Sequence, residues 1–194
     1  KKSYKFSTHL SGKHNLYNIA AAICVAIEEN ISIKNIAKGL NDFQGVGRRF
    51  ELSKIYLADQ PHVLIDDYGH HPAEILSTIL ATKEKFPRKK ICMIFEPHRY
   101  TRTQQLFDDF VKVLSKVDFL LLLDIYPASE KPIKGISSKK IAFQISKNHK
   151  NAHYLGNQDP IDWLQNNHQD FSILITQGAG TISKLNNEIK KKWQ

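Results

Sequence analysis

Residues 63–72 read V-L-I-D-D-Y-G-H-H-P, three apolar residues followed directly by charged and aromatic ones. An uninterrupted apolar run such as 63–65 is typical of a short strand that is buried on both faces. Pro72 suits the first position of a helix, and we expect that helix to continue to about Phe86. The stretch therefore predicts a strand, a polar loop and a helix in succession.

The same order of elements recurs along the rest of the chain. We expect further strands at 50–57, 91–95, 119–123, 152–155 and 171–175, and helices at 103–117, 137–146, 159–166 and 180–192. Strands and helices alternate five times, and the strands are continuously apolar. That combination is typical of a parallel sheet covered by helices. The predicted fold class is α/β, with a mainly parallel sheet and helices on both faces.

The first quarter of the chain follows a different pattern. Apolar residues have helical spacing over 14–29, and a second helix is expected over 32–43, with Ser32 as its N-cap. The stretch Q-G-V-G-R-R (44–49) interrupts this pattern with two glycines, and alternation begins after it. We therefore expect a domain boundary here, between a helical region 1–48 and an α/β region 49–194.

Composition narrows the possible partners. The 194 residues carry a formal net charge of +9, which favours anionic partners such as nucleotides, phosphates or nucleic acid. The lysines are mostly scattered, and aromatic residues are not interleaved with basic ones as a stacking platform for nucleic acid requires. A basic nucleic-acid-binding module is therefore the less favoured of two function classes. No apolar run approaches the roughly 20 residues of a membrane span, so we expect no membrane-spanning helix.

Four polar segments directly follow predicted strands: 66–72, 96–103, 124–132 and 176–181. The carboxyl ends of parallel strands meet at one edge of a sheet, and open α/β sheets bind ligands there. We therefore expect these segments to form one rim that carries the functional site.

The first rim segment contains two adjacent carboxylates and two adjacent histidines. Asp66 or Asp67 can cap the following helix, or can hold the two hydroxyls of a ribose. His70 and His71 can orient an anion or carry a proton, because histidine titrates near neutrality. Both the structural and the functional interpretation remain open at this point.

The second rim segment contains Arg99 and Arg102, three residues apart where a loop meets a helix. Two guanidinium groups in this position can bind a carboxylate or a phosphate. Alternatively, they can pair with Asp108, Asp109 or Glu96. The functional interpretation is favoured, because cations at a helix N-terminus oppose the helix dipole and call for a compensating anion.

Two further patterns concern nucleotides and metals. The run G-A-G-T-I-S (178–183) lacks the third glycine of a dinucleotide-binding turn, so we expect only a turn that lets the backbone approach a neighbour. The phosphate-binding motif G-x-x-x-x-G-K-S/T occurs nowhere in the chain. His149 and His153 stand four residues apart without the rest of a zinc motif, and no metal ligand is expected.

Four segments in the same order resemble the Mur ligase family, the ATP-dependent amide ligases of peptidoglycan precursor synthesis. They are G-K-H-N-L-Y-N-I-A-A-A (12–22), F-Q-G-V-G-R-R-F-E (43–51), D-D-Y-G-H-H-P (66–72) and P-H-R-Y-T-R-T (97–103). The resemblance is strongest to members that add L-alanine to UDP-N-acetylmuramate. It implies that 1–48 is the tail of a central ATP-binding domain and 49–194 a C-terminal Rossmann-like domain.

The resemblance also implies roles for individual residues. Those expected at the nucleotide are His14, Asn15, Asn18, Arg48, Arg49, Asp67 and Tyr68. Those expected at the incoming amino acid, and in catalysis, are His70, Arg99 and Arg102. Two rim positions depart from the family pattern, since Glu96 stands where glutamine is frequent and Thr181 where aspartate is frequent; Glu96 can pair with Arg99.

The implied reaction joins L-alanine to UDP-N-acetylmuramate through an acyl phosphate, with ATP and Mg²⁺ and in the cytoplasm. The resemblance places the metal ligands and the triphosphate loop upstream of Lys1. The chain has no initiator methionine, since Met93 is its only methionine, and we expect it to be a piece of a longer protein rather than a processed product. The chain alone is therefore expected to be inactive. A family member that recycles muropeptides by adding a whole peptide is the alternative within the family.

Overall fold

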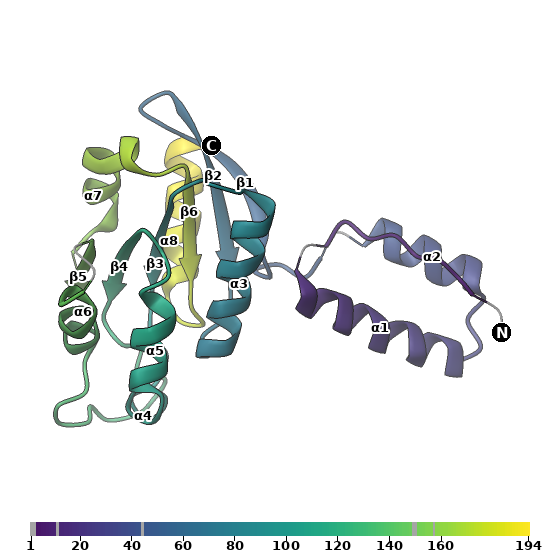
Figure 1. Cartoon of the computed structure of the whole chain (residues 1–194), viewed down its shortest axis with the longest axis horizontal. Coiled ribbons are helices and arrows are strands. Elements are labelled where there is room, and N and C mark those ends of the chain that lie inside the picture. Colours follow the sequence, from purple (N-terminus) through teal and green to yellow (C-terminus); the bar gives the residue numbers. More distant parts are fainter. Residues whose placement is uncertain (1–2, 11, 44, 149–150, 157) are drawn as a thin grey trace. The chain divides into compact units, whose positions relative to one another are not determined.

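The computed structural model describes the chain except for residues 1–2, 11, 44, 149–150 and 157 and the side chain of His14. The chain divides into two compact units, Lys1–Gly47 and Arg48–Gln194. Figure 1 labels the helices and strands of both. Each unit is described by itself below.

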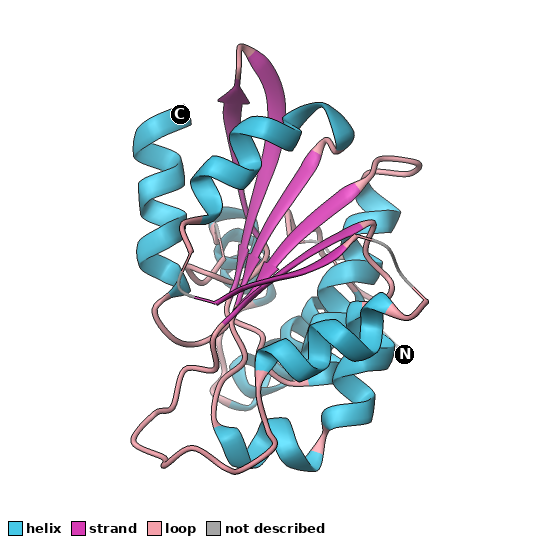
Figure 2. Cartoon of the chain, turned by 90° about the vertical axis from the view of Figure 1, so that its left-hand side faces the viewer, coloured by secondary structure: helices cyan, strands magenta, loops and turns pink. Residues whose placement is uncertain are grey.

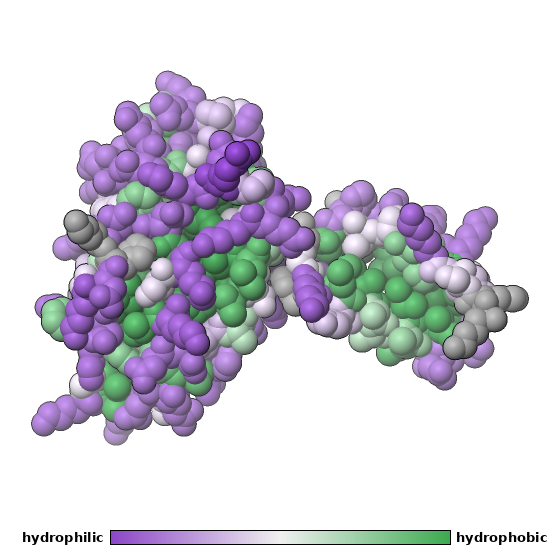
Figure 3. Space-filling model, in the orientation of Figure 1, coloured by the Kyte–Doolittle hydropathy of each residue, from purple (hydrophilic) through white to green (hydrophobic). Residues whose placement is uncertain are grey.

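The first unit is a pair of helices, α1 (Lys13–Glu28) and α2 (Ile33–Asp42). The hydroxyl of Ser32 accepts a hydrogen bond from the backbone N–H of Asn35 at 3.3 Å, which confirms Ser32 as the N-cap of α2. Many apolar side chains of this unit are exposed, and Figure 3 shows them in green on the face in view. Only Ile36 is buried among the apolar side chains that the structure describes in this unit.

The second unit contains a six-stranded sheet with the strand order β1-β2-β6-β3-β4-β5. The strands are β1 Glu51–Leu57, β2 Gln60–Asp67, β3 Ile91–Phe95, β4 Phe119–Leu123, β5 Ala152–Gly156 and β6 Ile173–Gln177. Only β1 pairs antiparallel, with β2, and the remaining pairs are parallel. The predicted mainly parallel sheet is confirmed.

Helices cover both faces of this twisted sheet (Figure 2). They are α3 Pro72–Lys85, α4 Tyr100–Gln105, α5 Phe107–Leu114, α6 Ser138–Ser146, α7 Pro160–Asn167, a short 3₁₀ helix His168–Asp170 and α8 Ile182–Trp193. Neighbouring strand residues point to opposite faces, so Ile65 packs in the core with α3, α5 and α6, whereas Leu64 packs with α7 and α8. The predicted helix layers on both faces are therefore confirmed.

Strand β6 is Ile173–Gln177, two residues later than the predicted 171–175, and two other elements differ more. Strand β2 begins at Gln60, earlier than expected, because it forms a hairpin with β1 through Ala58 and Asp59, which both have positive φ (45° and 62°). The single helix expected over 103–117 is two helices, α4 and α5, separated at Leu106 with φ −114° and ψ 24°.

None of the described helices is long and apolar enough to cross a membrane.

Candidate functional site at the carboxyl edge of the sheet

The four polar segments singled out in the sequence meet at one edge of the sheet. Asp67 at the end of β2 is paired with Gln177 of β6, which is in turn paired with Phe95 of β3. Next along the edge, His98 forms an isolated parallel bridge with Tyr126, which follows β4. The prediction of a shared rim is therefore confirmed.

Asp67 is a buried carboxylate, 6% exposed, that accepts three hydrogen bonds from the protein. The donors are the backbone N–H groups of Phe50 and Gly69, at 2.9 and 2.8 Å, and Nε2 of Gln177 at 2.9 Å. Burial raises the pKa of Asp67, while the two backbone N–H groups act in the opposite direction. A side-chain hydrogen bond with Thr78 also lowers the pKa of Asp67, so contacts within the protein fix the orientation of this carboxylate.

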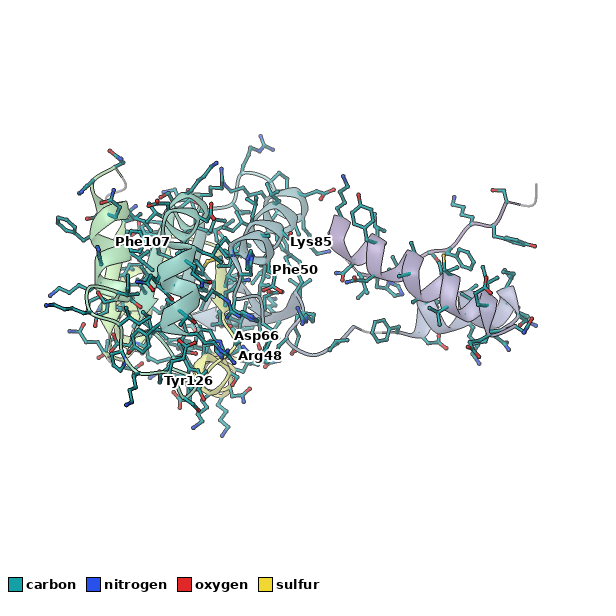
Figure 4. All side chains as sticks on the ribbon, turned by 90° about the horizontal axis from the view of Figure 1, so that it is seen from below. Arg48, Phe50, Asp66, Lys85, Phe107 and Tyr126 are labelled. Carbon is teal, nitrogen blue, oxygen red and sulfur yellow. The ribbon has the colours of Figure 1, made fainter. Side chains whose placement is uncertain are left out.

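Asp66 is also buried and is paired with a cation. Its Oδ2 lies 3.1 Å from Nε of Arg48 and accepts from Nδ2 of Asn186 at 3.2 Å, and its Oδ1 accepts from the hydroxyl of Thr176 at 3.3 Å. Figure 4 labels Arg48 and Asp66, which lie side by side. The carboxylate thus ties the start of the α/β unit to β6 and α8.

Neither carboxylate caps α3, so the capping interpretation of Asp66 and Asp67 is wrong. The N-cap is His71, whose Nδ1 accepts from the N–H of Ala73 at 3.2 Å. The carboxylate of Glu74 accepts in return from the N–H of His71 at 3.0 Å, which completes a capping box. The carboxylates of Asp66 and Asp67 accept instead from donors outside the first turn of α3.

Arg48 and Arg49 both place a guanidinium 5.4 Å from the ring centroid of Tyr68, but their surroundings differ. Arg48 is half-buried and donates through Nη2 to the carbonyl oxygen of Gly178 at 2.7 Å, besides its pair with Asp66. Arg49 is exposed and makes no ion pair with any residue that the structure describes. Arg48 is therefore occupied within the protein, whereas Arg49 can reach an external anion.

This difference predicts that replacing Arg48 lowers the stability of the chain far more than replacing Arg49. Arg48→Ala should lower the free energy of unfolding of the chain by about 2–4 kcal/mol, because it leaves the carboxylate of Asp66 buried without its cation. Arg49→Ala, the matched control, should change it by less than about 0.5 kcal/mol. Urea denaturation of both variants at pH 7 measures the difference, and equal effects would contradict the assignment.

The effect of Arg48→Ala should also depend on pH. Burial raises the pKa of Asp66 above its usual value of 3.8, against the opposing charge of Arg48. Because the folded-state pKa is the higher one, protonation favours the folded state as the pH falls through it. A protonated Asp66 carries no charge for Arg48 to balance. The free energies of unfolding of wild type and Arg48→Ala, measured by urea denaturation at decreasing pH, should therefore become more similar.

A row of four aromatic rings crosses the rim. Tyr68 and His70 follow β2, His98 follows β3 and Tyr126 follows β4, and the centroids of successive rings are 5.4 Å apart. His98 and Tyr126 are nearly parallel, with 20° between their planes. Sequence reasoning selected neither His98 nor Tyr126, although both lie directly after strands in segments that it had singled out.

The two predicted arginines lie beside this row. Nη1 of Arg102 donates to the carbonyl oxygen of His98 at 3.1 Å and lies 3.3 Å from Nδ1 of the same residue. Burial, and then the charges of His70 and Arg102, lower the pKa of His98, so its neutral ring can accept from the guanidinium. Arg99 is exposed, with a positive φ of 74°. The rim therefore presents two guanidinium groups and two imidazoles within one row of neighbouring loops.

The expected alternative partners of these arginines are not found. Among the described residues, neither Arg99 nor Arg102 forms an ion pair with Asp108, Asp109 or Glu96. The proposed pairing of Glu96 with Arg99 is wrong because both oxygens of Glu96 are used elsewhere.

Glu96 instead fixes the start of α8. Its Oε1 accepts from the hydroxyl of Thr181 at 2.6 Å, and its Oε2 accepts from the N–H of Ile182 at 3.0 Å. The two departures from the family pattern therefore face each other as acceptor and donor. A Cβ on Gly180 would lie 2.5 Å from Glu96 Oε2, and Gly178 has φ +146°. The glycine run thus allows the close backbone approach that was expected.

The remaining predicted residues belong to the helical unit. Asn15 and Asn18 are three apart on α1 and therefore lie on neighbouring positions of one helix face. Asn18 is exposed and Asn15 is half-buried. The side chain of His14 lies outside the described part of the chain, as does the whole of His149.

The rim does not fit a magnesium site. Asp66, Asp67 and Glu96 all accept hydrogen bonds from donors of the protein itself. Among the residues that the structure describes, no group of three or more His, Cys, Asp or Glu is arranged to hold a metal ion.

Comparison with protein families assigns most of the chain. Residues 48–180 match the family model described as Mur ligase, glutamate ligase domain. Among solved structures, the UDP-N-acetylmuramate–alanine ligase of Thermotoga maritima is similar, with a TM-score of 0.76 and 23% identity over 99% of this chain and 40% of that one.

Two other solved structures are similar as well. A murein peptide ligase of Psychrobacter arcticus gives a TM-score of 0.69 at 20% identity, over 96% of this chain and 38% of that one. The folylpolyglutamate synthase of Thermotoga maritima gives a TM-score of 0.66 at 14% identity, over 99% of this chain and 42% of that one. The chain thus spans about 40% of the length of the proteins that it matches.

Proposed function

The chain belongs to the Mur ligase family, a family of ATP-dependent amide ligases, and from this premise we propose that it is the C-terminal part of the ligase that joins L-alanine to UDP-N-acetylmuramate in peptidoglycan precursor synthesis. Residues 1–48 would then be the tail of the central ATP-binding domain. The working protein would be a longer, cytoplasmic enzyme that contains the remaining domains.

The observation that carries this proposal is the placement of the two arginines. Arg99 and Arg102 lie on the loop and first turns after β3, next to the imidazoles of His70 and His98. A small amino acid presents one carboxylate and one amine, and guanidinium groups bind carboxylates with paired hydrogen bonds. The arginines would hold the carboxylate of L-alanine and direct its amine toward the site of reaction.

The proposed reaction has two steps. The muramyl carboxylate takes the terminal phosphoryl group of ATP, which gives an acyl phosphate and ADP. The amine of L-alanine then attacks the acyl carbon, the amide bond forms, phosphate leaves and the amine loses its proton. Nδ1 of His70 lies 3.2 Å from the carbonyl oxygen of Tyr68 and can donate to it, which leaves Nε2 as an acceptor for that proton.

The nucleotide would be held at the start of the α/β unit. Arg49 is exposed for a phosphate and lies over the ring of Tyr68, and Asp67 would accept from a ribose hydroxyl in place of one of its present donors. On the helical unit, His14, Asn15 and Asn18 would serve the adenine. Arg48 would act by holding the rim together. Mg²⁺ would neutralise the phosphates, and its ligands would come from upstream of Lys1.

A comparison of acceptors tests the proposal. The full-length ligase should use L-alanine at least about 100-fold more efficiently, in kcat/KM, than the tripeptide that a muropeptide-recycling ligase adds. A discrimination of that size corresponds to roughly 3 kcal/mol of transition-state binding. Preference for the tripeptide would assign the chain to the recycling branch instead.

A further inference from the structure

The polar segment 124–132, after β4, has no part in the function proposed above, yet it is fastened to the loop that carries the arginines. The N–H of Arg99 donates to the carbonyl oxygen of Tyr126, and the N–H of Tyr126 donates to the carbonyl oxygen of Pro97, both at 2.8 Å. The ring of Tyr126 stacks on that of His98. Since Arg102 donates to Nδ1 and to the carbonyl of His98, Tyr126 supports Arg102 through one intermediate residue.

The same segment holds the arginine loop at a second point. Oε2 of Glu130 accepts from the N–H of Thr101 at 3.0 Å, and Oε1 accepts from its hydroxyl at 2.6 Å. Hydrogen bonds from Thr101, the hydroxyl first and then the backbone N–H, lower the pKa of Glu130. The N–H of Thr101 lies in the first turn of α4, where it has no acceptor within the helix. Glu130 therefore caps α4 from a different loop.

Both facing loops contain residues in the left-handed region. Arg99 has φ 74°, and Ala128 and Ser129 have φ 46° and 70°. The N–H of Glu130 donates to the carbonyl oxygen of Pro127 at 3.0 Å, so Ala128 and Ser129 form the centre of a tight turn. Residues other than glycine stay in this region only when surrounding contacts fix them, and such strain gathers at functional sites.

We infer that segment 124–132 is the positioning element of the arginine pair. Tyr126 acts through His98 on Arg102, and Glu130 acts through Thr101 on the loop of Arg99. Together they hold both guanidinium groups in the arrangement that binds the carboxylate of the acceptor amino acid. The identity of that acceptor rests on the proposed function, whereas the holding of the loop does not.

Two measurements on the full-length ligase test this inference separately. The first is hydrogen exchange of residues 97–103, which reports the loop directly and requires no turnover. Exchange there should increase at least about threefold in Glu130→Ala and in Tyr126→Leu. Exchange of these residues should stay at the wild-type rate in Tyr126→Phe, because phenylalanine keeps the ring that stacks on His98. Glu84→Ala, which removes an exposed carboxylate near the far end of α3, should leave it unchanged.

The second measurement is the steady-state rate. In Glu130→Ala and Tyr126→Leu, KM for L-alanine should rise roughly three- to tenfold, the range for a partly exposed charged hydrogen bond. KM for ATP should stay within about twofold of wild type. Unchanged exchange in both variants would overturn the inference, whatever the acceptor is. Faster exchange without a rise in KM for L-alanine would overturn the link to the acceptor carboxylate.

A wild-type ligase that does not add L-alanine would refute the proposed function. In that case the exchange measurement still decides whether segment 124–132 holds the arginine loop.

Discussion

Arg99→Ala in the full-length ligase should lower kcat/KM for L-alanine roughly 100- to 1,000-fold, the loss expected when a charged donor is removed from a developing or bound anion. Arg99 is exposed, and its contacts with Tyr126 and Thr103 run through its backbone N–H and carbonyl groups. Alanine keeps both groups. The fold should therefore survive while the guanidinium is lost.

Arg88→Ala is the matched control for this variant. Arg88 is also an exposed arginine with a positive φ, 65°, but it precedes β3 and so lies at the opposite edge of the sheet. Replacing Arg88 changes charge and backbone preference in the same way but leaves the rim untouched. The value of kcat/KM for L-alanine should therefore stay within about twofold of wild type. Near-normal turnover of Arg99→Ala would remove Arg99 from the site.

The central strands could be predicted closely from the sequence. The apolar runs 91–95 and 119–123 are β3 and β4 residue for residue. These strands lie inside a sheet with helices on both faces, so burial alone requires five consecutive apolar residues. Pro72 likewise stands at the first position of α3, where its missing N–H costs nothing.

Features that depend on distant contacts could not be predicted in this way. The insertion of β6 between β2 and β3 leaves no local mark on any of the three strands. The hairpin between β1 and β2 turns through Ala58 and Asp59. Glycine is the usual sequence signal for such a turn, and this pair contains none.

The candidate site also has a part that could be predicted from local sequence and a part that depends on distant contacts. The four rim segments could be found because each follows a strand, and the strand ends could be predicted. The roles within them could not, since the partner of Asp66 is Asn186, 120 residues further on, and His98 acquires its place from Tyr126 of another loop. Adjacent residues therefore differ in their contacts: Arg48 is paired with Asp66, whereas Arg49 is exposed and forms no ion pair with any described residue.

The largest expected effect concerns the chain as a whole. Residues 1–194 alone should release no measurable phosphate from ATP, even with UDP-N-acetylmuramate and L-alanine present. Phosphoryl transfer needs groups that cradle the triphosphate and a metal ion that neutralises it. The chain contains no G-x-x-x-x-G-K-S/T motif, and the rim carboxylates are bonded within the protein.

The inactive chain must be shown to be folded for this result to count. Cooperative unfolding in urea, with Arg48→Ala as the destabilised reference, provides that control. A folded and inactive chain would agree with a divided site, in which the rim described above serves the acceptor amino acid and the ribose.

Phosphate release in parallel reactions tests the divided site most directly. One reaction contains residues 1–194 and the other the full-length protein, at equal concentrations with ATP, Mg²⁺, UDP-N-acetylmuramate and L-alanine. We expect release only from the full-length protein, and only when L-alanine is present. The divided site would be contradicted by L-alanine-dependent phosphate release from residues 1–194 alone. It would also be contradicted if an intact full-length protein released no phosphate.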